Sequence, residues 1–445
     1  MKILFISLGC DKNLADSEEM LGLLTGSGHE IVDSEEEADA IVVNTCCFIH
    51  DAKEESVNTI LEMAEYKTSG SCKVLIVTGC MAQRYKEEII QEIPEVDAVL
   101  GTTSYGDIVK ALNEAQAGNV FQEFRDINDL PEDSGRRIIT TGGHFGYLKI
   151  AEGCDKHCTY CIIPSLRGKF RSVPEERLLK QAEYMASQGV KELILVAQET
   201  TVYGTDLYGK KTLHILLKKL CQIKGIRWIR ILYCYPEEIY DELIQVMKEE
   251  KKICHYLDLP IQHASDRILR RMGRRTSKAQ LVDIITKLRR EIPDIVLRTS
   301  LITGFPGETE EDHQELMEFV DEMEFDRLGV FTYSPEEGTP AETMEGQVPE
   351  ELKEERRDEI MELQQEISLE KGDSRIGQEL LVMIEGKVSG ESAYIGRTYG
   401  DAPKVDGYIF VQTGELLVTG DFAKVKVTGA LEYDLIGELA DEYTE

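Results

Sequence analysis

The sequence contains no long hydrophobic run. None of its apolar stretches approaches the roughly 18 residues that a transmembrane helix needs. The apolar stretch at the start of the chain is too short for a secretory signal peptide, and no small-residue cleavage site follows it. We therefore expect a soluble, cytoplasmic protein with no membrane partner.

Basic residues are also scarce. The chain holds 50 Lys and Arg against 83 Asp and Glu, which gives a formal net charge of −33. A field of this sign repels nucleic acid, whose binding rests largely on phosphate neutralisation, and attracts basic partners. The same charge also serves plain solubility, so by itself it does not identify a partner.

Disulfide bonds are not expected either. The chain has eleven cysteines, an odd number, and disulfides are rare in cytosolic proteins. Clustered thiols in such a protein more often bind metal ions or iron–sulfur clusters. Five of the cysteines follow no pattern and are expected to be bystanders or ordinary core or surface residues: Cys47, Cys72, Cys221, Cys234 and Cys254.

Three other cysteines fall within a single short stretch, CDKHCTYC. We call Cys154, Cys158 and Cys161 the loop trio. A closed zinc site needs four protein ligands, and His157 is poorly placed to be the fourth because it adjoins Cys158. Thiolates also favour iron–sulfur clusters, and three of them would leave one iron free to bind a small molecule.

Residues 1–118 are predicted to form an N-terminal α/β domain. Strand-like apolar runs alternate there with helical stretches, which is typical of a parallel sheet. The strands are expected at 3–10, 40–46 and 74–80, and the helices at 16–26, 51–66 and 83–91. A polar, turn-rich segment over 119–145 is predicted to be a linker.

The remaining cysteines follow these three strands. We call Cys10, Cys46 and Cys80 the N-terminal trio. Because the carboxyl ends of parallel strands meet at one edge of a sheet, where ligands bind, the three thiols are expected to converge. The plainer explanation is that buried cysteines are common in strands.

Residues 140–371 are predicted to form a second α/β domain. A closed eight-stranded βα barrel usually needs about 250 residues, so we expect a partial barrel. A long charged helix over 349–372 is predicted to be a connector. The six expected strands are 147–153, 192–198, 228–234, 255–261, 295–304 and 327–333.

Residues 373–441 have a different pattern. Short alternating strands are separated by glycine turns there, which predicts a small antiparallel β-barrel.

The loop trio, with the aromatic Tyr160 before its last cysteine, resembles the signature of radical S-adenosylmethionine enzymes. Its position after a first barrel strand agrees, as does the glycine motif ITGFPGET (302–309) after a later strand. The resemblance implies a 4Fe-4S cluster whose open iron binds the amino and carboxylate groups of S-adenosylmethionine. An electron from the cluster then cleaves the sulfonium and yields a 5′-deoxyadenosyl radical.

Four residues are candidates for binding this cofactor: Tyr160, Arg298, Gly304 and Gly307. Arg298 and the two glycines are expected at the carboxyl end of a strand, where the nucleoside could lie. Arg298 could equally belong to a structural ion pair. No catalytic acid or base is evident, and radical hydrogen abstraction does not require one.

The order of the three parts resembles the methylthiotransferase family over essentially the whole chain. The terminal barrel resembles a TRAM domain, a substrate-binding module. The resemblance implies that the N-terminal trio holds a second 4Fe-4S cluster, whose open iron delivers sulfur to a carbon that the radical has activated. It also implies an electron-donor protein as a partner.

Members of this family modify either an adenosine in tRNA or an aspartate β-carbon in the twelfth protein of the small ribosomal subunit. Residues 373–441 carry twelve acidic and six basic side chains, a net of −6, which favours a basic ribosomal protein, free or in the ribosome, over tRNA. Three stretches resemble the ribosomal-protein branch, RimO, although Lys404 stands where an acidic residue is expected: 161–168, 196–209 and 396–407.

An arginine-rich stretch, RILRRMGRR (267–275), argues for the tRNA alternative. Its cluster Arg270–Arg275 could bind RNA, or it could be a solvated helix end. A non-enzymatic iron–sulfur carrier or ribosome-binding module is the other class of function that the sequence leaves open.

Overall fold

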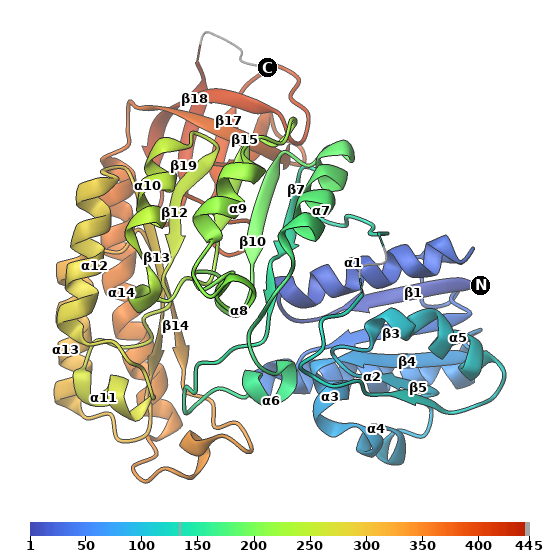
Figure 1. Ribbon diagram of the computed structural model, residues 1–445. Coiled ribbons are helices and arrows are strands. Elements are labelled where there is room, and N and C mark those ends of the chain that lie inside the picture. The colour runs from blue at the N-terminus through green and yellow to red at the C-terminus, as the bar shows by residue number, and fades with distance from the viewer. Residues whose placement is uncertain (133–134, 441–445) are drawn as a thin grey trace.

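The computed structural model describes residues 1–132 and 135–440, and Figure 1 shows three units that follow one another along the chain. The N-terminal unit lies at the lower right of the view, the central unit at the left and the C-terminal unit at the top. Residue 441, the last of the predicted third domain, and residues 133–134 of the predicted linker lie outside the described residues. Among the described residues, no helix combines the length and the apolar character needed to traverse a bilayer.

The N-terminal unit is a six-stranded sheet in which every neighbouring pair is parallel, in the order β2-β1-β3-β4-β5-β6. Its strands are β1 (Lys2–Ser7), β2 (Glu30–Val32), β3 (Ala40–Thr45), β4 (Val74–Gly79), β5 (Ala98–Leu100) and β6 (Phe121–Glu123). Its helices are α1 (Asp11–Gly26), α2 (His50–Ser69), α3 (Cys80–Tyr85), α4 (Glu87–Glu92) and α5 (Ile108–Gln116), with a 3₁₀ turn at Tyr105–Asp107.

Helices cover both faces of this sheet. On β3, Ile41 and Val43 belong to one apolar cluster with Ile60 of α2. Val42, which points to the other face, packs in a second cluster with Met20 of α1. This burial on both faces explains why the strands read as continuous apolar runs in the sequence.

Two predictions for this unit are wrong. The helix expected over 83–91 is broken into α3 and α4 at Lys86, whose φ of +45° cannot continue a helix. Residues 121–123, expected in the linker, form β6 and pair with β5 at the edge of the sheet.

The central unit is an open six-stranded parallel sheet in the order β14-β13-β12-β11-β10-β7, which confirms the partial βα barrel. Its strands are β7 (Phe145–Lys149), β10 (Glu192–Val196), β11 (Trp228–Ile231), β12 (Ile253–Asp258), β13 (Val296–Thr303) and β14 (Arg327–Thr332), beside the short antiparallel pair β8 (Ala151–Glu152) and β9 (Arg171–Ser172). Its helices are α6 (Ile163–Arg167), α7 (Glu175–Ser187), α8 (Thr205–Tyr208), α9 (Leu213–Leu220), α10 (Asp241–Glu249), α11 (Asp266–Arg271), α12 (Lys278–Glu291), α13 (Glu310–Met323) and α14 (Glu350–Asp373), with 3₁₀ turns at Pro236–Glu238 and Pro340–Thr343.

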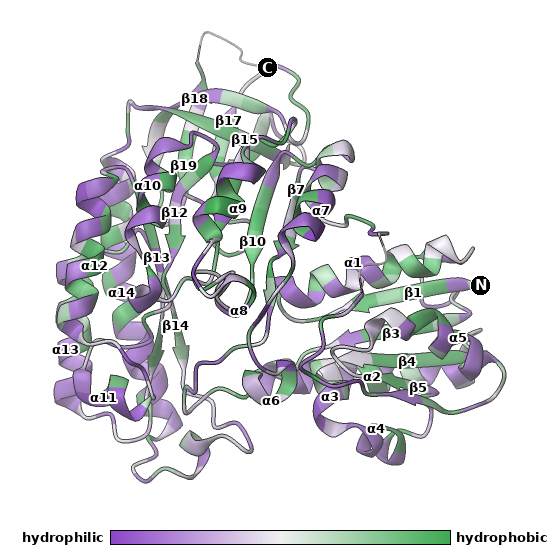
Figure 2. Cartoon of the chain, viewed as in Figure 1, coloured by the Kyte–Doolittle hydropathy of each residue, from purple (hydrophilic) through white to green (hydrophobic). Residues whose placement is uncertain are grey.

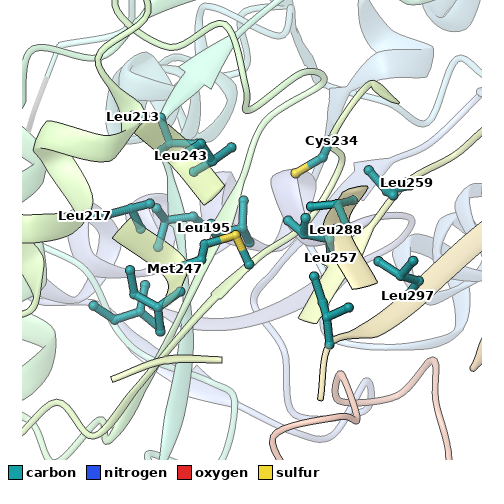
Figure 3. Packing of buried hydrophobic residues seen from close by; sticks show 14 of the residues in the cluster. Leu195, Leu213, Leu217, Cys234, Leu243, Met247, Leu257, Leu259, Leu288 and Leu297 are labelled. Atoms are coloured by element: carbon teal, nitrogen blue, oxygen red, sulfur yellow. The ribbon is translucent and has the colours of Figure 1, made fainter. Parts of the chain in front are cut away.

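The core of this unit lies between the sheet and its helices. Figure 3 shows leucines of the strands, such as Leu195 and Leu257, gathered with Leu217 of α9 and Met247 of α10. Each of these side chains is fully buried, and burying one such side chain contributes about 1.5–3 kcal/mol. Figure 2 shows the matching pattern of apolar strands and polar outer helices.

The helix predicted as a connector packs into the core instead. α14 buries Ile360 and Ile367 in the central cluster. Its Gln364 side chain donates a hydrogen bond to the Phe325 carbonyl oxygen. The five patternless cysteines are likewise all buried core residues: Cys47, Cys72, Cys221, Cys234 and Cys254.

The C-terminal unit is a closed five-stranded barrel in the order β15-β16-β17-β19-β18. Its strands are β15 (Glu379–Lys387), β16 (Ala393–Arg397), β17 (Ile409–Gln412), β18 (Phe422–Ala430) and β19 (Leu435–Leu439). The prediction of an antiparallel barrel is wrong for one pair, because β17 and β19 run parallel where the barrel closes.

The barrel docks onto the central sheet through buried ion pairs. Glu192 of β10 is fully buried and accepts hydrogen bonds from Arg230 of β11 at 2.8 Å and from Arg397 of the barrel at 2.7 Å. Phe422 of the barrel packs edge-on against Trp228, with ring centroids 4.8 Å apart. The barrel is therefore held rigidly to the sheet that carries the loop trio.

Candidate functional site

The N-terminal trio lies at the carboxyl edge of the first sheet. Cys10 caps the amino end of α1 after β1, Cys46 follows β3 directly, and Cys80 begins α3 after β4. Glycine is required before two of these cysteines. Gly9 has φ of +85°, and a Cβ there would lie 2.7 Å from the Cβ of Cys46.

The three thiols of the N-terminal trio are electrostatic neighbours. Burial, together with the nearby Cys80 and Cys10 thiols, raises the pKa of Cys46 to about 12. Burial also raises the pKa of Cys80, while the Arg167 guanidinium acts in the opposite direction. Cys10 is exposed, so the trio is buried on one side and open on the other.

Polar side chains fix the loops that carry this trio. Asn13 donates to the carbonyl oxygens of Leu8 at 3.1 Å and Thr45 at 3.0 Å. Ser56 accepts from the Cys46 backbone N–H at 3.0 Å and donates to its carbonyl oxygen at 2.8 Å. Neither residue was predicted from the sequence, because neither belongs to the cysteine pattern that marks the trio.

The loop trio lies just after β8, at the carboxyl end of the central sheet. Gly153 precedes it with φ of +72°, and a Cβ there would collide with the Lys169 carbonyl oxygen. Burial raises the pKa of Cys154 to about 11 and that of Cys161 to about 12, and the other trio thiols add to both shifts. His157 is exposed, in agreement with its assignment as a loop residue.

All eleven cysteines are free thiols. Among the described residues, no group of three or more His, Cys, Asp or Glu side chains is arranged to hold a single metal ion. The thiols within each trio are free and lie close enough to raise one another's pKa, so each trio fits a cluster with thiolate ligands, provided that the thiols lose their protons on binding.

Buried polar atoms without partners surround the loop trio. Oε2 of Glu199 and the Nε and Nη1 atoms of Arg274 are buried with no hydrogen-bond partner among the described residues. Burial raises the pKa of Glu199 to about 7, although hydrogen bonds from Thr201 lower it. Such groups need a partner, and an amino acid with its own ammonium and carboxylate supplies opposite charges for both. S-adenosylmethionine therefore fits this wall of the site.

The loop after β11 connects the two trios. The Tyr235 hydroxyl lies 3.8 Å from Sγ of Cys158, and the Arg274 guanidinium stacks on the Tyr235 ring at 4.3 Å. Tyr233 lies two residues earlier, and its hydroxyl donates a hydrogen bond at 3.2 Å to Asp11, the residue that directly follows Cys10. This loop was predicted only as the end of a strand, and its role as a bridge was missed.

Arg167 makes a second connection between the trios. It lies in α6, shortly after the loop trio, and its guanidinium donates to Sγ of Cys80 at 3.5 Å and to Asp16 at 2.8 Å. Lys149 of β7 contacts the same Asp16 and also Glu152. This buried ion network joins the N-terminal and central units at the candidate site.

The four residues predicted to bind the cofactor have varied surroundings. Tyr160 lies inside the loop trio and packs edge-on against Phe305, with ring centroids 6.3 Å apart. The space that a Cβ would need at Gly304 is filled by Lys353, and a Cβ at Gly307 would lie 3.0 Å from Cζ of Arg271. Both glycines therefore face side chains of this chain, and their role in cofactor binding stays a prediction.

Arg298 forms structural ion pairs, which is one of the two roles that the sequence allowed for it. Its guanidinium lies 2.8 Å from Asp258 and 3.3 Å from Asp406. Asp406 belongs to the 396–407 stretch and accepts a hydrogen bond from the Tyr256 hydroxyl at 2.7 Å. This stretch therefore turns inward onto the central sheet.

The arginine-rich stretch 267–275 begins in α11 and is a free basic patch only in part, since Arg270 and Arg275 are exposed and Arg271 and Arg274 contact the rest of the chain. Arg274 is buried at the loop trio, and its Nη2 donates to the Pro260 carbonyl oxygen at 2.9 Å. Arg271 donates to the carbonyl oxygens of Pro306 and Glu345. Arg270 donates to the Asp266 carbonyl oxygen.

Sequence-family models match three segments of the chain. Residues 2–101 match the family described as "Uncharacterized protein family UPF0004", residues 148–320 match the radical SAM superfamily, and residues 376–440 match the TRAM domain. The N-terminal trio falls in the first segment and the loop trio in the second.

Curated relatives are similar over nearly the entire chain. The ribosomal protein uS12 methylthiotransferase RimO of Lachnoclostridium phytofermentans is 65% identical over 437 residues, which cover 98% of this chain and 99% of that protein. RimO of Clostridium perfringens is 52% identical over 442 residues, covering 99% of this chain and 98% of that protein. RimO of Pelotomaculum thermopropionicum is also 52% identical, over 98% of this chain and 99% of that protein.

Solved structures with similar folds are much more distant in sequence. The radical S-adenosylmethionine methyltransferase TsrM of Kitasatospora setae has a TM-score of 0.54 at 12% identity, over 77% of each chain. The cobalamin-dependent S-adenosylmethionine radical enzyme OxsB has a TM-score of 0.51 at 14% identity, over 82% of this chain and 56% of that one. These likenesses concern the fold alone.

Proposed function

This chain belongs to the RimO family of radical S-adenosylmethionine methylthiotransferases, and we propose that it attaches a methylthio group to the β-carbon of an aspartate in ribosomal protein uS12. The observation that carries this conclusion is the 65% identity to a RimO protein over 98% of the chain. Radical S-adenosylmethionine enzymes use S-adenosylmethionine and a 4Fe-4S cluster, and methylthiotransferases use a second cluster.

Each trio binds one of the two clusters. The loop trio binds the first 4Fe-4S cluster and the N-terminal trio binds the second. The first cluster would supply the electron that cleaves the sulfonium of S-adenosylmethionine, and the second would supply the sulfur. Residues 1–118 therefore act in sulfur delivery, residues 140–371 in radical generation and residues 373–441 in substrate binding.

Side chains of the central sheet hold S-adenosylmethionine beside the loop trio. Glu199 accepts from its ammonium and Arg274 donates to its carboxylate, because both have buried atoms with no partner. Tyr160 lies beside the same thiols. The predicted contacts of Arg298, Gly304 and Gly307 with the nucleoside are a weaker part of the proposal, since Arg298 is already paired with two aspartates.

A basic protein suits the surface of this chain as a partner. The net charge is −33, and uS12 as a ribosomal protein brings the opposite sign. In the stretch 267–275, Arg271 and Arg274 are occupied by internal carbonyl oxygens, which leaves fewer arginines for the tRNA alternative. The reaction takes place in the cytoplasm, where ribosomes are. A separate protein donates the electron.

Mass spectrometry of cells lacking this protein tests the proposal. We expect uS12 to lose its methylthio group while the methylthioadenosine of tRNA remains. Loss of the tRNA modification with uS12 still modified would contradict it. Complementation with the wild-type gene is the control that ties the loss to this chain.

A further inference from the structure

Lys12 is a largely covered residue that carries a positive charge at the junction of the two trios. It lies two residues after Cys10 in the first turn of α1, and the residue is 7% exposed. Its ammonium Nζ stands 3.3 Å from the centroid of the Tyr233 ring, on the loop that reaches Cys158. Among the residues that the structure describes, no ion pair or hydrogen bond is formed by this Nζ.

The other cations at this junction are neutralised by carboxylates. Arg167 pairs with Asp16, and Arg298 pairs with Asp258. Lys156, in the loop of the loop trio, pairs with Glu238. Lys12 is the exception among them, so its positive charge is available to an anionic ligand.

Tyr233 is held rigidly beneath this ammonium. Its φ of +59° lies in the left-handed region, which is strained for a tyrosine. Its backbone N–H donates to Asp258 at 3.0 Å, and its hydroxyl donates to Asp11 at 3.2 Å. These contacts present the ring face to Lys12, and a ring face stabilises a cation without neutralising its charge.

We propose that Lys12 binds the carboxylate of the substrate aspartate and so places its β-carbon between the two trios. This inference rests on the function proposed above. The side-chain carboxylate of aspartate is bonded directly to the β-carbon, so an ion pair with Lys12 fixes the position of the atom that reacts.

The same ion pair selects the substrate. An aspartate pairs with the ammonium, whereas a neutral asparagine or a neutral adenine base covers it from water and leaves it without an anion. Lys12 therefore favours an acidic side chain as the target over a nucleobase.

The test compares two substrates on two forms of the reconstituted enzyme. Mass spectrometry of uS12 treated with wild-type enzyme first identifies the modified aspartate, which is then replaced by asparagine in a second uS12 preparation. Dissociation constants for both forms are measured anaerobically by fluorescence anisotropy. We expect wild type to bind the aspartate form about 30-fold more tightly than the asparagine form, a ratio typical of a charged hydrogen bond.

The variant Lys12→Met keeps an apolar stem over Tyr233 and removes the charge. We expect its dissociation constant for the aspartate form to rise about 30-fold and that for the asparagine form to change less than about 3-fold. Lys12→Arg, which restores a cation, should recover most of the preference for aspartate.

Lys110→Met is the matched control. Lys110 lies on α5, away from both trios, with its Nζ 5.0 Å from the centroid of the Phe121 ring. This variant also loses a cation–π contact, but both dissociation constants should remain at the wild-type values.

Equal weakening of both substrate forms by Lys12→Met, or an unchanged preference for aspartate, would overturn the inference. If Lys12→Met does not bind iron, Lys12→Gln and Lys12→Arg give the same comparison. A failure of the wild-type enzyme to modify uS12 would instead overturn the proposed function itself, and the inference with it.

Discussion

The two trios are built in different ways. The loop trio comes from one short loop, so its convergence depends on the local conformation that Gly153 permits. The N-terminal trio comes from the ends of three strands, so its thiols meet only when the whole N-terminal sheet has formed. One site is specified by spacing and the other by topology.

The two trios also differ in the polar groups that surround them. Unpaired buried atoms of Glu199 and Arg274 lie next to the loop trio, which suits a polar small molecule. Beside the N-terminal trio the cation Arg167 is already paired with Asp16, and Cys10 is exposed. The difference agrees with the proposal that the loop trio binds a cofactor molecule and that the N-terminal trio faces the substrate.

Replacing the three cysteines of the loop trio by alanine should have the largest effect. We expect no 5′-deoxyadenosine from S-adenosylmethionine and a reductant, because the loop trio is the set of thiols that lies beside the unpaired atoms of Glu199 and Arg274. Iron content should fall from about eight to about four atoms per chain. Cleavage by this variant at the wild-type rate would remove the distinction between the trios.

Replacing the three cysteines of the N-terminal trio should separate the two activities. At least some cleavage of S-adenosylmethionine should remain, since the loop trio and its polar wall are intact, while sulfur insertion into uS12 stops. Chromatography of 5′-deoxyadenosine and mass spectrometry of uS12 measure the two outcomes on one sample. Sulfur insertion without this trio would show that its thiols have another role.

The two glycines that precede the trios offer a finer comparison. Gly153→Ala forces a Cβ against the Lys169 carbonyl oxygen, and Gly9→Ala forces one against Cys46, both at positive φ. Strain of this kind costs about 1–3 kcal/mol per residue. We expect each variant to lower iron occupancy at its own trio, as measured by iron analysis and electron paramagnetic resonance, and to leave the other trio filled.

Removing the Arg167 contact with Cys80 should have the smallest effect. In Arg167→Met the N-terminal cluster loses a cation that favours its reduced form, so its midpoint potential should become more negative by about 60 mV, or about 1.4 kcal/mol. Arg137→Met is the matched control. Arg137 pairs with Glu18 of α1, the helix that also carries Asp16, and within the described part of the chain no contact joins Arg137 to a trio cysteine. An equal shift in both variants would attribute the effect to loosened packing.

Much of the fold was predictable from local patterns. Alternating apolar strands and helices predicted both parallel sheets, because strands buried on both faces leave continuous apolar runs in the sequence. The break at Lys86 was not predictable, since nothing in the apolar pattern marks its positive φ. The parallel pairing of β17 with β19 was missed because alternation gives a strand's faces but not its direction.

The site was predictable only where a pattern of residues along the chain carries the signal. The spacing of the loop trio and the strand ends of the N-terminal trio are visible in the chain, although cluster binding by either stays a prediction. Lys12, Arg167 and Tyr233 were missed because their contacts join the N-terminal unit to the central one. Such contacts follow from the docking of two sheets, which no residue spacing encodes.

Methylthiolation of uS12 by this chain is tested most simply by the mass of uS12 after anaerobic incubation with the reconstituted enzyme, S-adenosylmethionine and a reductant. We expect one methylthio group to replace one hydrogen of uS12, and fragment ions to place the added mass on a single aspartate. An unmodified uS12, together with a tRNA that gains the methylthio group under the same conditions, would contradict it.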